Sequence, residues 1–420
     1  MGQDTVRQQA LAAKEAAGQM ALLSEEVRNA MLRSMAMALR EHSEQILAAN
    51  AEDVEAAAAD GMSASKLDRL TLDSGRIEGM AASLEDLAGL ADPVGRITQA
   101  RTLDSGVELE QVTVPLGVVA MVYEARPNVT ADAAGICLKA GNSCILRGGS
   151  AAVRSNAVIA EALRQAAVSQ GAPAHCITLI ADTGHAATDE LLRLRGVVDL
   201  LIPRGGAGLI RHCVENALVP VIETGTGNNT VYVHDPADID QAVSIILNAK
   251  CSRPSVCNAI EHVLADASIA SELYAALLPE LADEGCEIRG DEQVRIAGAA
   301  AKVPVLAAVD EDWDTEYLDL VISIKTVAGP DQAIAHINAH GTGHSECIVT
   351  RDQAAAEHFL ASVDAAAVYW NASTRFTDGG EFGLGAEIGI STQKTHVRGP
   401  FALDALVTTK YLLRGTGQVR

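Results

Sequence analysis

Two cysteines stand six positions apart in the stretch CSRPSVCNAIE (residues 251–261), on either side of Pro254. Such a pair can form a metal half-site, a redox couple, or one nucleophilic thiol with a bystander. Cys251 closes a predicted helix, whose negative dipole end raises a thiol pKa. Cys257 follows Arg253 in a loop that the proline keeps out of the helix, and a nearby guanidinium favours the thiolate. From these local residues alone, a buried structural thiol remains the more frequent use of Cys257.

The eight cysteines of the chain are scattered, and no CxxC pair occurs among them. This distribution argues against a disulfide framework and against structural zinc, and it fits a reducing cytoplasm. We therefore expect no bound metal. Five cysteines lie among apolar neighbours, as small buried hydrophobic residues do, and Cys286 has no evident partner.

Composition and charge limit the partners of this chain. Its 420 residues predict two or three domains, and its hydrophobic content of 48% is sufficient for buried cores. The net charge of −23 repels phosphate backbones, so no nucleic acid is expected as a partner, and an anionic substrate needs a locally positive pocket. We find neither a signal peptide nor an apolar run long enough to cross a bilayer, so we expect a cytoplasmic protein without a membrane partner.

The elements that must position any active site alternate between short apolar runs and helical segments. Residues 4–92 predict alanine-rich helices, in which Asn50 is expected to cap a turn. Five apolar runs follow (GVVAMVY, SCILR, CITLIA, VDLLIP and PVIET), separated by four helical segments. This alternation predicts an α/β fold with a doubly wound parallel sheet, and a second α/β unit begins at TVYVH.

Residues 101–115 have a different pattern, because polar and apolar residues alternate on both faces of a predicted hairpin. The alternating tail ALDALVTTKYLL can pair with this hairpin, and we expect 101–115 and 393–420 to form a small β oligomerisation element. The cofactor domain is then expected to comprise 1–100, 116–224 and 366–392, and the catalytic domain 225–365. A homo-oligomer, a dimer or a tetramer, follows from this organisation.

Glycine turns follow the second and fourth predicted strands, where ligands bind in doubly wound sheets. They read Arg147-Gly148-Gly-Ser150 and Arg204-Gly205-Gly206, whereas a GxGxxG fingerprint is absent. Each turn alone is better explained as a tight chain reversal, but two on one sheet edge favour a nucleotide. Arg147 stands near the position where NAD enzymes carry an acid for the ribose, and a cation there suits the 2′-phosphate of NADP.

Longer stretches resemble the aldehyde dehydrogenase superfamily, and within it the gamma-glutamyl phosphate reductase family. The matching stretches cover nearly the whole chain: PLGVVAMVYEARPNVT, RPSVCNAIE, GHSECIVTRD and AAAVYWNASTRFTDGGEFGLGAEIGISTQKTHVRGP. The resemblance places Asn128 at the oxyanion position, Cys257 at the nucleophile and Glu316 at the nicotinamide ribose. Glu223 matches the superfamily's second glutamate, and its separation of 34 residues from Cys257 (257 − 223) matches as well.

The resemblance implies a fold and a reaction. We expect an aldehyde-dehydrogenase-like fold and reduction of L-glutamyl 5-phosphate by NADPH to glutamate 5-semialdehyde, with release of phosphate, in proline biosynthesis. Cys257 would form a thioester, stabilised by the Asn128 amide and its own N–H. Because water would destroy this intermediate, we assign Glu223 a structural or cofactor-proximal role rather than that of a base.

Four cations are candidates for the two anionic ends of this substrate. Arg253 suits the leaving phosphate, although a surface ion pair explains it equally well. His344, His396 and Arg398 are candidates for the substrate carboxylate. The chain departs from the family pattern at 229–230, where the usual Cys-His is replaced by Asn-Thr.

Two other functions remain open at this point. One is a dehydrogenase that oxidises an aldehyde to an acid or an acyl-CoA, which would not depend on phosphate. The other is a non-catalytic scaffold that associates with a glutamate 5-kinase, which predicts erosion of the nucleophile and the glycine turns. Neither is eroded.

Overall fold

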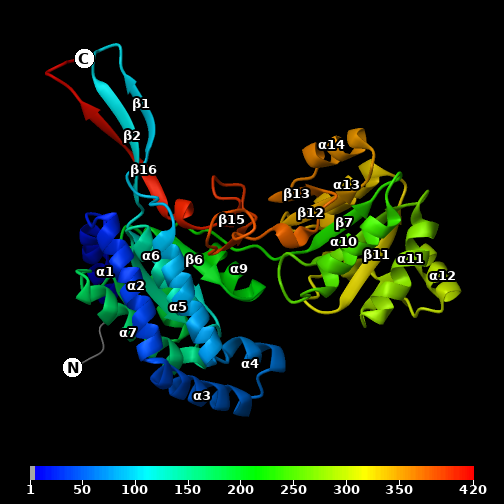
Figure 1. The fold of residues 1–420 in the computed structure, drawn as a ribbon, viewed down its shortest axis with the longest axis horizontal. Helices are drawn as coiled ribbons and strands as arrows, with labels where there is room; N and C mark the ends of the chain where they lie inside the picture. Colours follow the sequence, from blue (N-terminus) through cyan, green and yellow to red (C-terminus); the bar gives the residue numbers. More distant parts are fainter. Residues whose placement is uncertain (1–4) are drawn as a thin grey trace. The chain divides into compact units, whose positions relative to one another are not determined.

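The computed structural model describes residues 5–420, which divide into two compact units. Unit 1 contains the described residues up to Thr224, together with Leu384–Ile388 and Phe401–Arg420. Unit 2 contains Gly225–Gly383 and Gly389–Pro400. Figure 1 labels the elements of both units. None of the helices in the described part of the chain has the length and hydrophobicity needed to span a bilayer.

Unit 1 is built on a parallel sheet, as predicted, but the sheet has four strands rather than five. Its strands are β3 (Val118–Tyr123), β4 (Ser143–Gly148), β5 (Ile177–Leu179) and β6 (Leu200–Arg204), in the order β5-β4-β3-β6. All residues of β3 and β4 are buried, because helices cover both faces of the sheet. The predicted fifth strand at 220–224 is reduced to an isolated bridge between Leu201 and Val221.

The helices of unit 1 form two layers around this sheet. One face packs against α1 (Val6–Met20), α8 (His185–Leu192) and α9 (Ala207–Asn216) in a shared apolar cluster. Helices α6 (Asn128–Lys139) and α7 (Val153–Ser169) also pack on the sheet, and α2 (Glu25–Glu41) and α5 (Ser74–Gly89) pack onto them. The two remaining helices are α3 (Ser43–Ala59) and α4 (Ala64–Leu70).

The prediction that Asn50 caps a helix is wrong. Asn50 lies inside α3 and is buried, and its side-chain amide donates to Leu70 O and to Ser155 Oγ. Its Oδ1 accepts the Leu72 N–H at 2.7 Å. The residue therefore stabilises tertiary structure, because it joins α3 to chain segments that lie far away in the sequence.

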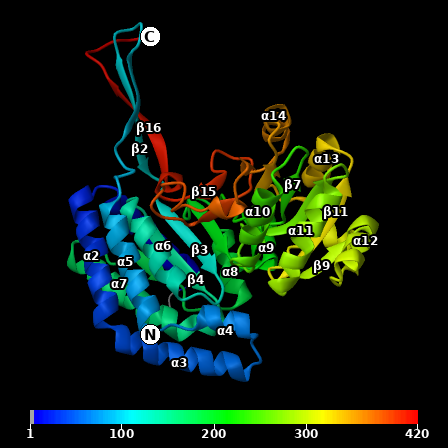
Figure 2. The ribbon, with the colours of Figure 1, turned by 45° about the vertical axis from the view of Figure 1, so that its right-hand side comes forward.

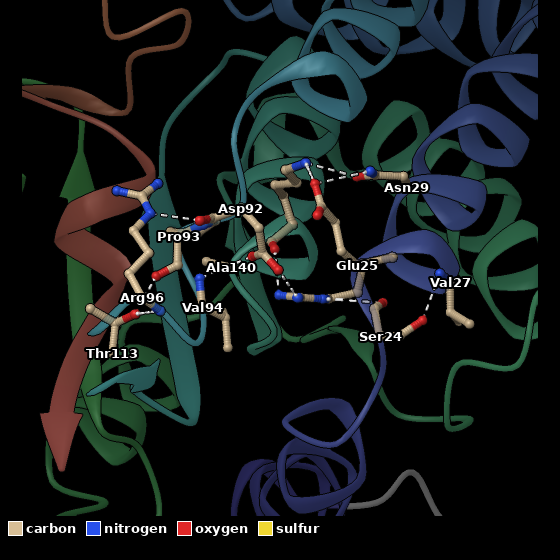
Figure 3. A network of polar contacts seen from close by, with 12 residues as sticks. Ser24, Glu25, Val27, Asn29, Asp92, Pro93, Val94, Arg96, Thr113 and Ala140 are labelled. Carbon is tan, nitrogen blue, oxygen red and sulfur yellow. Dashed lines mark hydrogen bonds and ion pairs between the residues drawn. The ribbon is translucent and has the colours of Figure 1, made fainter. Parts of the chain in front are cut away.

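A buried cluster of charged groups joins the helices of unit 1 to the start of its antiparallel sheet. Arg28 donates to Asp92 Oδ2 at 2.6 Å and to Lys139 O at 2.9 Å. Burial lowers the pKa of Lys139, whose ammonium donates to Asn29 Oδ1 at 2.8 Å. Figure 3 shows this network and its extension to Arg96. Because each buried charge has a polar partner, the network fixes the chain where it leaves the helices.

The antiparallel sheet of unit 1 consists of β1 (Ile97–Thr102), β2 (Glu108–Pro115) and β16 (Val407–Arg414). Strand β16 pairs with β2, which confirms that the tail joins the hairpin. Every residue of β1 is exposed, and most of β16 is exposed as well. Figures 1 and 2 show these strands projecting from the helices of unit 1. We call these three strands the arm.

Unit 2 contains a second, all-parallel sheet in the order β10-β9-β11-β8-β7-β12-β13. Alternate residues of β7 and β8 point to opposite faces, so two separate apolar clusters form. Helices α10, α11 and α12 cover one face, and α13 and α14 cover the other. The bounds are β7 (Asn229–Val233), α10 (Ile239–Cys251), β8 (Ile260–Asp266), α11 (Ala270–Asp283), β9 (Glu287–Gly290), α12 (Glu292–Ala301), β10 (Leu306–Ala307), η2 (Asp310–Asp314), β11 (Val321–Val327), α13 (Pro330–His340), β12 (Ser345–Val349), α14 (Gln353–Ser362), β13 (Ala367–Trp370), η3 (Thr374–Phe376), β14 (Gly389–Ser391) and β15 (Gly399–Phe401).

The unit boundary after Thr224 coincides with the expected end of the cofactor domain, but the later boundaries differ. Residues 366–383 were expected in the cofactor domain and belong to unit 2, because β13 pairs with β12. Residues 393–400, which were expected with the tail, also belong to unit 2 and not to unit 1. Helix α12 and strands β9, β10 and β13 were not predicted from the sequence.

Candidate active site

Cys257 lies in the turn between α10 and β8 of unit 2, and it is half-buried. Cys251 is the last residue of α10, as predicted, and burial raises the pKa of its thiol. Pro254 falls between the two, outside the helix. The two thiols therefore occupy different environments, and Cys257 alone stands in a loop.

The backbone of Gly227 packs directly against Cys257. A Cβ added at Gly227 would lie 1.5 Å from Cys257 O, so this contact excludes every side chain. The Gly227 N–H in turn donates to Glu316 Oε1 at 2.6 Å. Burial raises the pKa of Glu316. Glu316, which was predicted to bind the nicotinamide ribose, is thus linked to the Cys257 loop through one glycine.

A second segment, η3 and the residues after it, holds the nucleophile loop through Asn258. The Asn258 amide donates to Thr377 O at 2.9 Å and to Arg375 O at 3.3 Å. Thr374 Oγ1 donates to Asn258 O at 2.7 Å. These bonds place Arg375 beside Cys257, and an electrostatic interaction joins the two side chains.

Two guanidinium groups therefore accompany the thiol. Burial, followed by the neighbouring charge of Arg253, lowers the pKa of Arg375. Within residues 5–420, neither guanidinium has a hydrogen bond or an ion pair to a carboxylate, although the Asp378 carboxylate acts on Arg375 electrostatically. In a chain of net charge −23, two neighbouring arginines with one carboxylate nearby form a locally positive site.

The other cations predicted for the substrate differ in their surroundings. His344 is fully buried, and burial lowers its pKa to about 4, so its ring is neutral near pH 7. Arg398 donates to Asp364 Oδ1 at 2.9 Å, and it lines a cavity of about 350 Å³ in unit 2 with Lys394, which also pairs with Asp364. His396 is exposed on the segment before Arg398. His344 Nδ1 contacts Ser345 Oγ at 2.7 Å, and Ser345 in turn bonds Asn229 and Thr377, so His344 lies behind the Cys257 loop.

In unit 1, the predicted cofactor residues lie at the carboxyl ends of β4 and β6, which flank β3. Arg147 is only 8% exposed and donates to the Thr183 and Gly184 carbonyls. Its Nε is buried without a hydrogen-bond partner among the described residues. Gly148 packs closely against Asn156, and Ser150 is exposed at the start of the 3₁₀ turn η1 (Ser150–Ala152).

The second glycine turn opens α9, as predicted from the sequence. Gly206 is the N-cap of this helix, and its N–H donates to Glu124 Oε2 at 2.9 Å. A carboxylate oxygen thus occupies the position where a helix N-terminus would hold a phosphate oxygen. A Cβ at Gly205 would lie 2.8 Å from the Glu124 carboxyl carbon, so the Glu124 side chain packs closely over the turn. The residues therefore fit an anionic group of a nucleotide, in competition with Glu124.

The two remaining predicted residues also belong to unit 1. Asn128 is the first residue of α6 and is exposed, and its amide donates to Asp132 Oδ2 at 3.1 Å. Burial raises the pKa of Asp132 to about 6. Glu223 is half-buried in the irregular segment after Val221, and the adjacent Thr224 Oγ1 donates to Pro203 O.

Comparisons with known proteins agree with this architecture. The model of the "Aldehyde dehydrogenase family" matches residues 1–297 and 292–387. A gamma-glutamyl phosphate reductase from Moorella thermoacetica is 52% identical over 408 residues, covering 97% of each chain. One from Thermobifida fusca is 49% identical over 415 residues, covering 99% of this chain and 98% of the relative. The chain belongs to the gamma-glutamyl phosphate reductases of the aldehyde dehydrogenase family.

A solved structure supports the same assignment. The crystal structure of gamma-glutamyl phosphate reductase from Thermotoga maritima superimposes with a TM-score of 0.96 at 43% identity, covering 99% of this chain and all of that one. The fold predicted from the family resemblance is therefore confirmed, and the chain is an oxidoreductase of this family.

Sequence reasoning missed three residues around the family's nucleophile: Gly227, Asn229 and Arg375. Arg375 lies 118 residues after Cys257 (375 − 257), inside a long family-like stretch that does not itself indicate what each residue does. Asn229 is visible in the sequence as a departure from the family pattern, but its contacts are not. For Gly227, the glycine-rich run ETGTGNN was the available signal, since close backbone contacts require glycine.

Proposed function

We propose that this chain catalyses the NADPH-dependent reduction of L-glutamyl 5-phosphate to L-glutamate 5-semialdehyde, with release of phosphate, as a step of proline biosynthesis. The observation that carries the proposal is a pair of neighbouring guanidinium groups, Arg253 and Arg375, of which Arg375 interacts with Cys257 and neither has a hydrogen bond or ion pair to a carboxylate in the described chain. An acyl phosphate carries its negative charge next to the carbon that a thiolate attacks. The names of the two relatives agree with this substrate.

The arginines have two tasks in this proposal. Guanidinium groups bind phosphate oxygens bidentately, so Arg253 and Arg375 hold the phosphate while its carbon meets the Cys257 sulfur. The same positive charge favours the thiolate form of Cys257. Phosphate then leaves as a stable anion, which removes the need for a strong general acid.

The chemistry at Cys257 proceeds in two parts. The thiolate attacks the acyl carbon, an S–C bond forms, and the C–O bond to phosphate breaks. NADPH, when bound, would supply a hydride to the thioester carbon. Cleavage of the C–S bond then releases the aldehyde and returns Cys257 as a thiolate. We assign the transient charge on the acyl oxygen to the Cys257 N–H and the Asn128 amide.

The cofactor residues of the proposal are those at the sheet edge of unit 1 and Glu316 of unit 2. The Gly205-Gly206 turn would bind a pyrophosphate oxygen, and Arg147 and Ser150 suit the 2′-phosphate of NADP. Glu316 would accept the ribose hydroxyls, next to the glycine that touches Cys257. Glu223 keeps a cofactor-proximal role, because a base near the thioester would promote its hydrolysis.

We also propose that the chain forms a homo-oligomer through the arm. Its outer strands leave main-chain groups available for pairing, and Ile97, Tyr411 and Leu413 are each more than half exposed. Association with a glutamate 5-kinase would shorten the exposure of the labile acyl phosphate to water. The eight cysteines are all free thiols, which suits a reducing cytoplasm.

The reaction run in reverse tests the proposal. Glutamate 5-semialdehyde should reduce NADP only when phosphate is present, because phosphate must cleave the thioester. Cys257→Ala should abolish the activity, whereas Cys251→Ala, at the other cysteine of the same stretch, should retain most of it. Activity without phosphate would instead support a hydrolytic aldehyde dehydrogenase.

A further inference from the structure

Asn229 makes an unusual set of contacts with the nucleophile loop. It is the first residue of β7 and is fully buried. Its amide group donates to Cys257 O at 2.7 Å and to Ala259 O at 2.7 Å. Its Oδ1 accepts the Ser345 N–H at 3.1 Å. Both amide hydrogens are therefore used on the loop that carries the thiol, and the remaining bond ties the side chain to β12.

The local sheet geometry explains why a side chain is needed there. Strands β7 and β8 change register between Asn229 and Thr230, and β8 begins only at Ile260. The carbonyls of Cys257 and Ala259 thus lie ahead of the regular ladder. Buried carbonyls require donors, and the Asn229 amide supplies one to each.

The loop is consequently held from two sides. Asn229 holds the carbonyls of Cys257 and Ala259, while Thr374 Oγ1 holds the Asn258 carbonyl between them. Three successive carbonyl groups are therefore fixed by three side-chain bonds. Gly227, two residues before Asn229, packs closely against the first of these carbonyls, that of Cys257.

We propose that Asn229 is a positioning residue for the nucleophile: it fixes the main chain at Cys257 so that the thiol keeps one orientation toward the acyl carbon and the two arginines. The identity of the reaction in this inference rests on the proposed function. The geometry rests only on the hydrogen bonds of Asn229. A displacement of about 1 Å at a reacting group costs on the order of 100-fold in rate, so two bonds to this loop are sufficient to affect turnover.

The residue type matters for this role. A cysteine at this position would have one weak S–H donor and could not supply two N–H groups to two carbonyls. The two bonds to the loop therefore require the amide of Asn229.

The test uses Asn229→Ala and Asn229→Cys in the full chain, with Asn142→Ala as the matched control. Asn142 is also fully buried, donates to two carbonyls, those of Leu406 and Ala140, and accepts one backbone N–H, from Gly117. It belongs to unit 1, away from the thiol loop in the chain and outside the proposed machinery. Three quantities are measured: the melting temperature, the kinetic constants, and the pH profile of Cys257 alkylation by iodoacetamide, followed by peptide mass spectrometry.

Asn229→Ala should lower kcat about 100-fold and leave KM for the acyl phosphate within about threefold. The midpoint of the alkylation profile should rise, because the thiol no longer keeps its place beside the guanidinium groups. Asn142→Ala should lower the melting temperature by a comparable amount without changing kcat or the midpoint. The kcat and the alkylation midpoint of Asn229→Cys should lie between those of the wild-type protein and Asn229→Ala. If Asn229→Ala fails to fold, Asn229→Cys takes its place in the test.

A variant at 229 that folds and keeps the wild-type kcat and alkylation midpoint would overturn the proposal. So would an equal loss of kcat in Asn142→Ala, since the effect would then report general destabilisation. Alkylation requires neither substrate nor cofactor. A protein without phosphate-dependent activity would therefore refute the proposed function, while the alkylation midpoint would still decide the role of Asn229.

Discussion

The groups that we propose to bind anions have different hydrogen-bond partners in the two units. In unit 1, Arg147 is occupied by two backbone carbonyls, and the Gly206 N–H at the start of α9 is occupied by Glu124. In unit 2, neither Arg253 nor Arg375 has a hydrogen bond or ion pair to a carboxylate within residues 5–420, and Asp378 acts on Arg375 only electrostatically. Both regions are built at loops next to parallel sheets, so the difference does not come from the fold.

This difference teaches how each region should respond to a ligand. A group that already has a hydrogen-bond partner must exchange it. Binding of the cofactor at the proposed site of unit 1 should therefore cost free energy that depends on Glu124. A guanidinium without a partner exchanges only water for phosphate, so the substrate end should bind without internal rearrangement. Loss of an arginine charge in unit 2 should therefore weaken substrate binding. Loss of the Glu124 charge in unit 1 should strengthen cofactor binding.

The largest effect is expected from Gly227→Ala. The new Cβ would lie 1.5 Å from Cys257 O, so the nucleophile loop must move away. We expect kcat to fall by at least about 100-fold, because the thiol shifts by more than the tolerance of a reacting group. Steady-state kinetics with circular dichroism as a check on folding would measure it.

Gly79→Ala is the control for this substitution, because a Cβ there meets nothing within 4 Å. It lies inside α5, where alanine is the better helix former, so stability should hold or rise. Unchanged kcat in Gly227→Ala would show that the contact does not position Cys257.

Removal of the second guanidinium should come next. Arg375→Met keeps much of the side-chain volume and removes the charge, and we expect kcat/KM for the acyl phosphate to fall about 100-fold. KM for NADPH should remain within about twofold. Arg351→Met, which removes an exposed arginine paired with Asp238, should leave both constants unchanged. Equal effects of the two variants would refute the specific role of Arg375.

A smaller effect with the opposite sign is expected in unit 1. Glu124→Gln retains an acceptor for the Gly206 N–H but removes a negative charge from the start of α9. We expect the dissociation constant of NADPH to fall by about two- to fivefold, since the pyrophosphate no longer meets a carboxylate. Fluorescence titration would measure it.

Glu215→Gln makes the same charge change near the other end of α9, where Glu215 is exposed. It should not alter NADPH binding. Weaker binding in Glu124→Gln would mean that Glu124 supports the cofactor site rather than competing for it.

The smallest effect concerns pH. Burial raises the pKa of Asp132 to about 6, so the folded state favours the protonated form. The stability that this gives is present below the unfolded value near 4 and is lost as the pH rises through about 6. Asp132→Asn should therefore raise the melting temperature by roughly 2 °C more at pH 7.5 than at pH 4.5. Asp104→Asn, in the exposed turn of the arm, should change the melting temperature by the same amount at pH 7.5 and at pH 4.5.

Periodic patterns predicted the elements of the fold well, because burial on one face leaves a regular trace. Met31, Met35 and Leu39 of α2 are all fully buried, as their four-residue spacing predicts. Asn50 shows the limit of such patterns. Its local sequence suggests a cap, whereas its bonds to Leu70, Leu72 and Ser155 depend on segments that only tertiary structure brings together.

The candidate site divides in the same way. Cys257 and Glu316 were predicted from family motifs, and the structure joins them through Gly227. Arg375 carries no periodic or local signal, because its place is set by a hydrogen bond from the side-chain amide of Asn258, 117 residues earlier (375 − 258), to the Arg375 carbonyl. Strand β13 has only four residues and is not fully buried, so hydrophobic patterning could not reveal it.

The pairing of β16 with β2 has a consequence for synthesis on the ribosome. Strand β2 and its neighbour β1 emerge early, but their third strand is almost the last part of the chain to appear. All of unit 2 is translated in between, so it can fold while the arm still waits for its partner. The nascent chain therefore carries an unfinished two-stranded edge for most of its elongation, and we expect chaperone dependence to concentrate there.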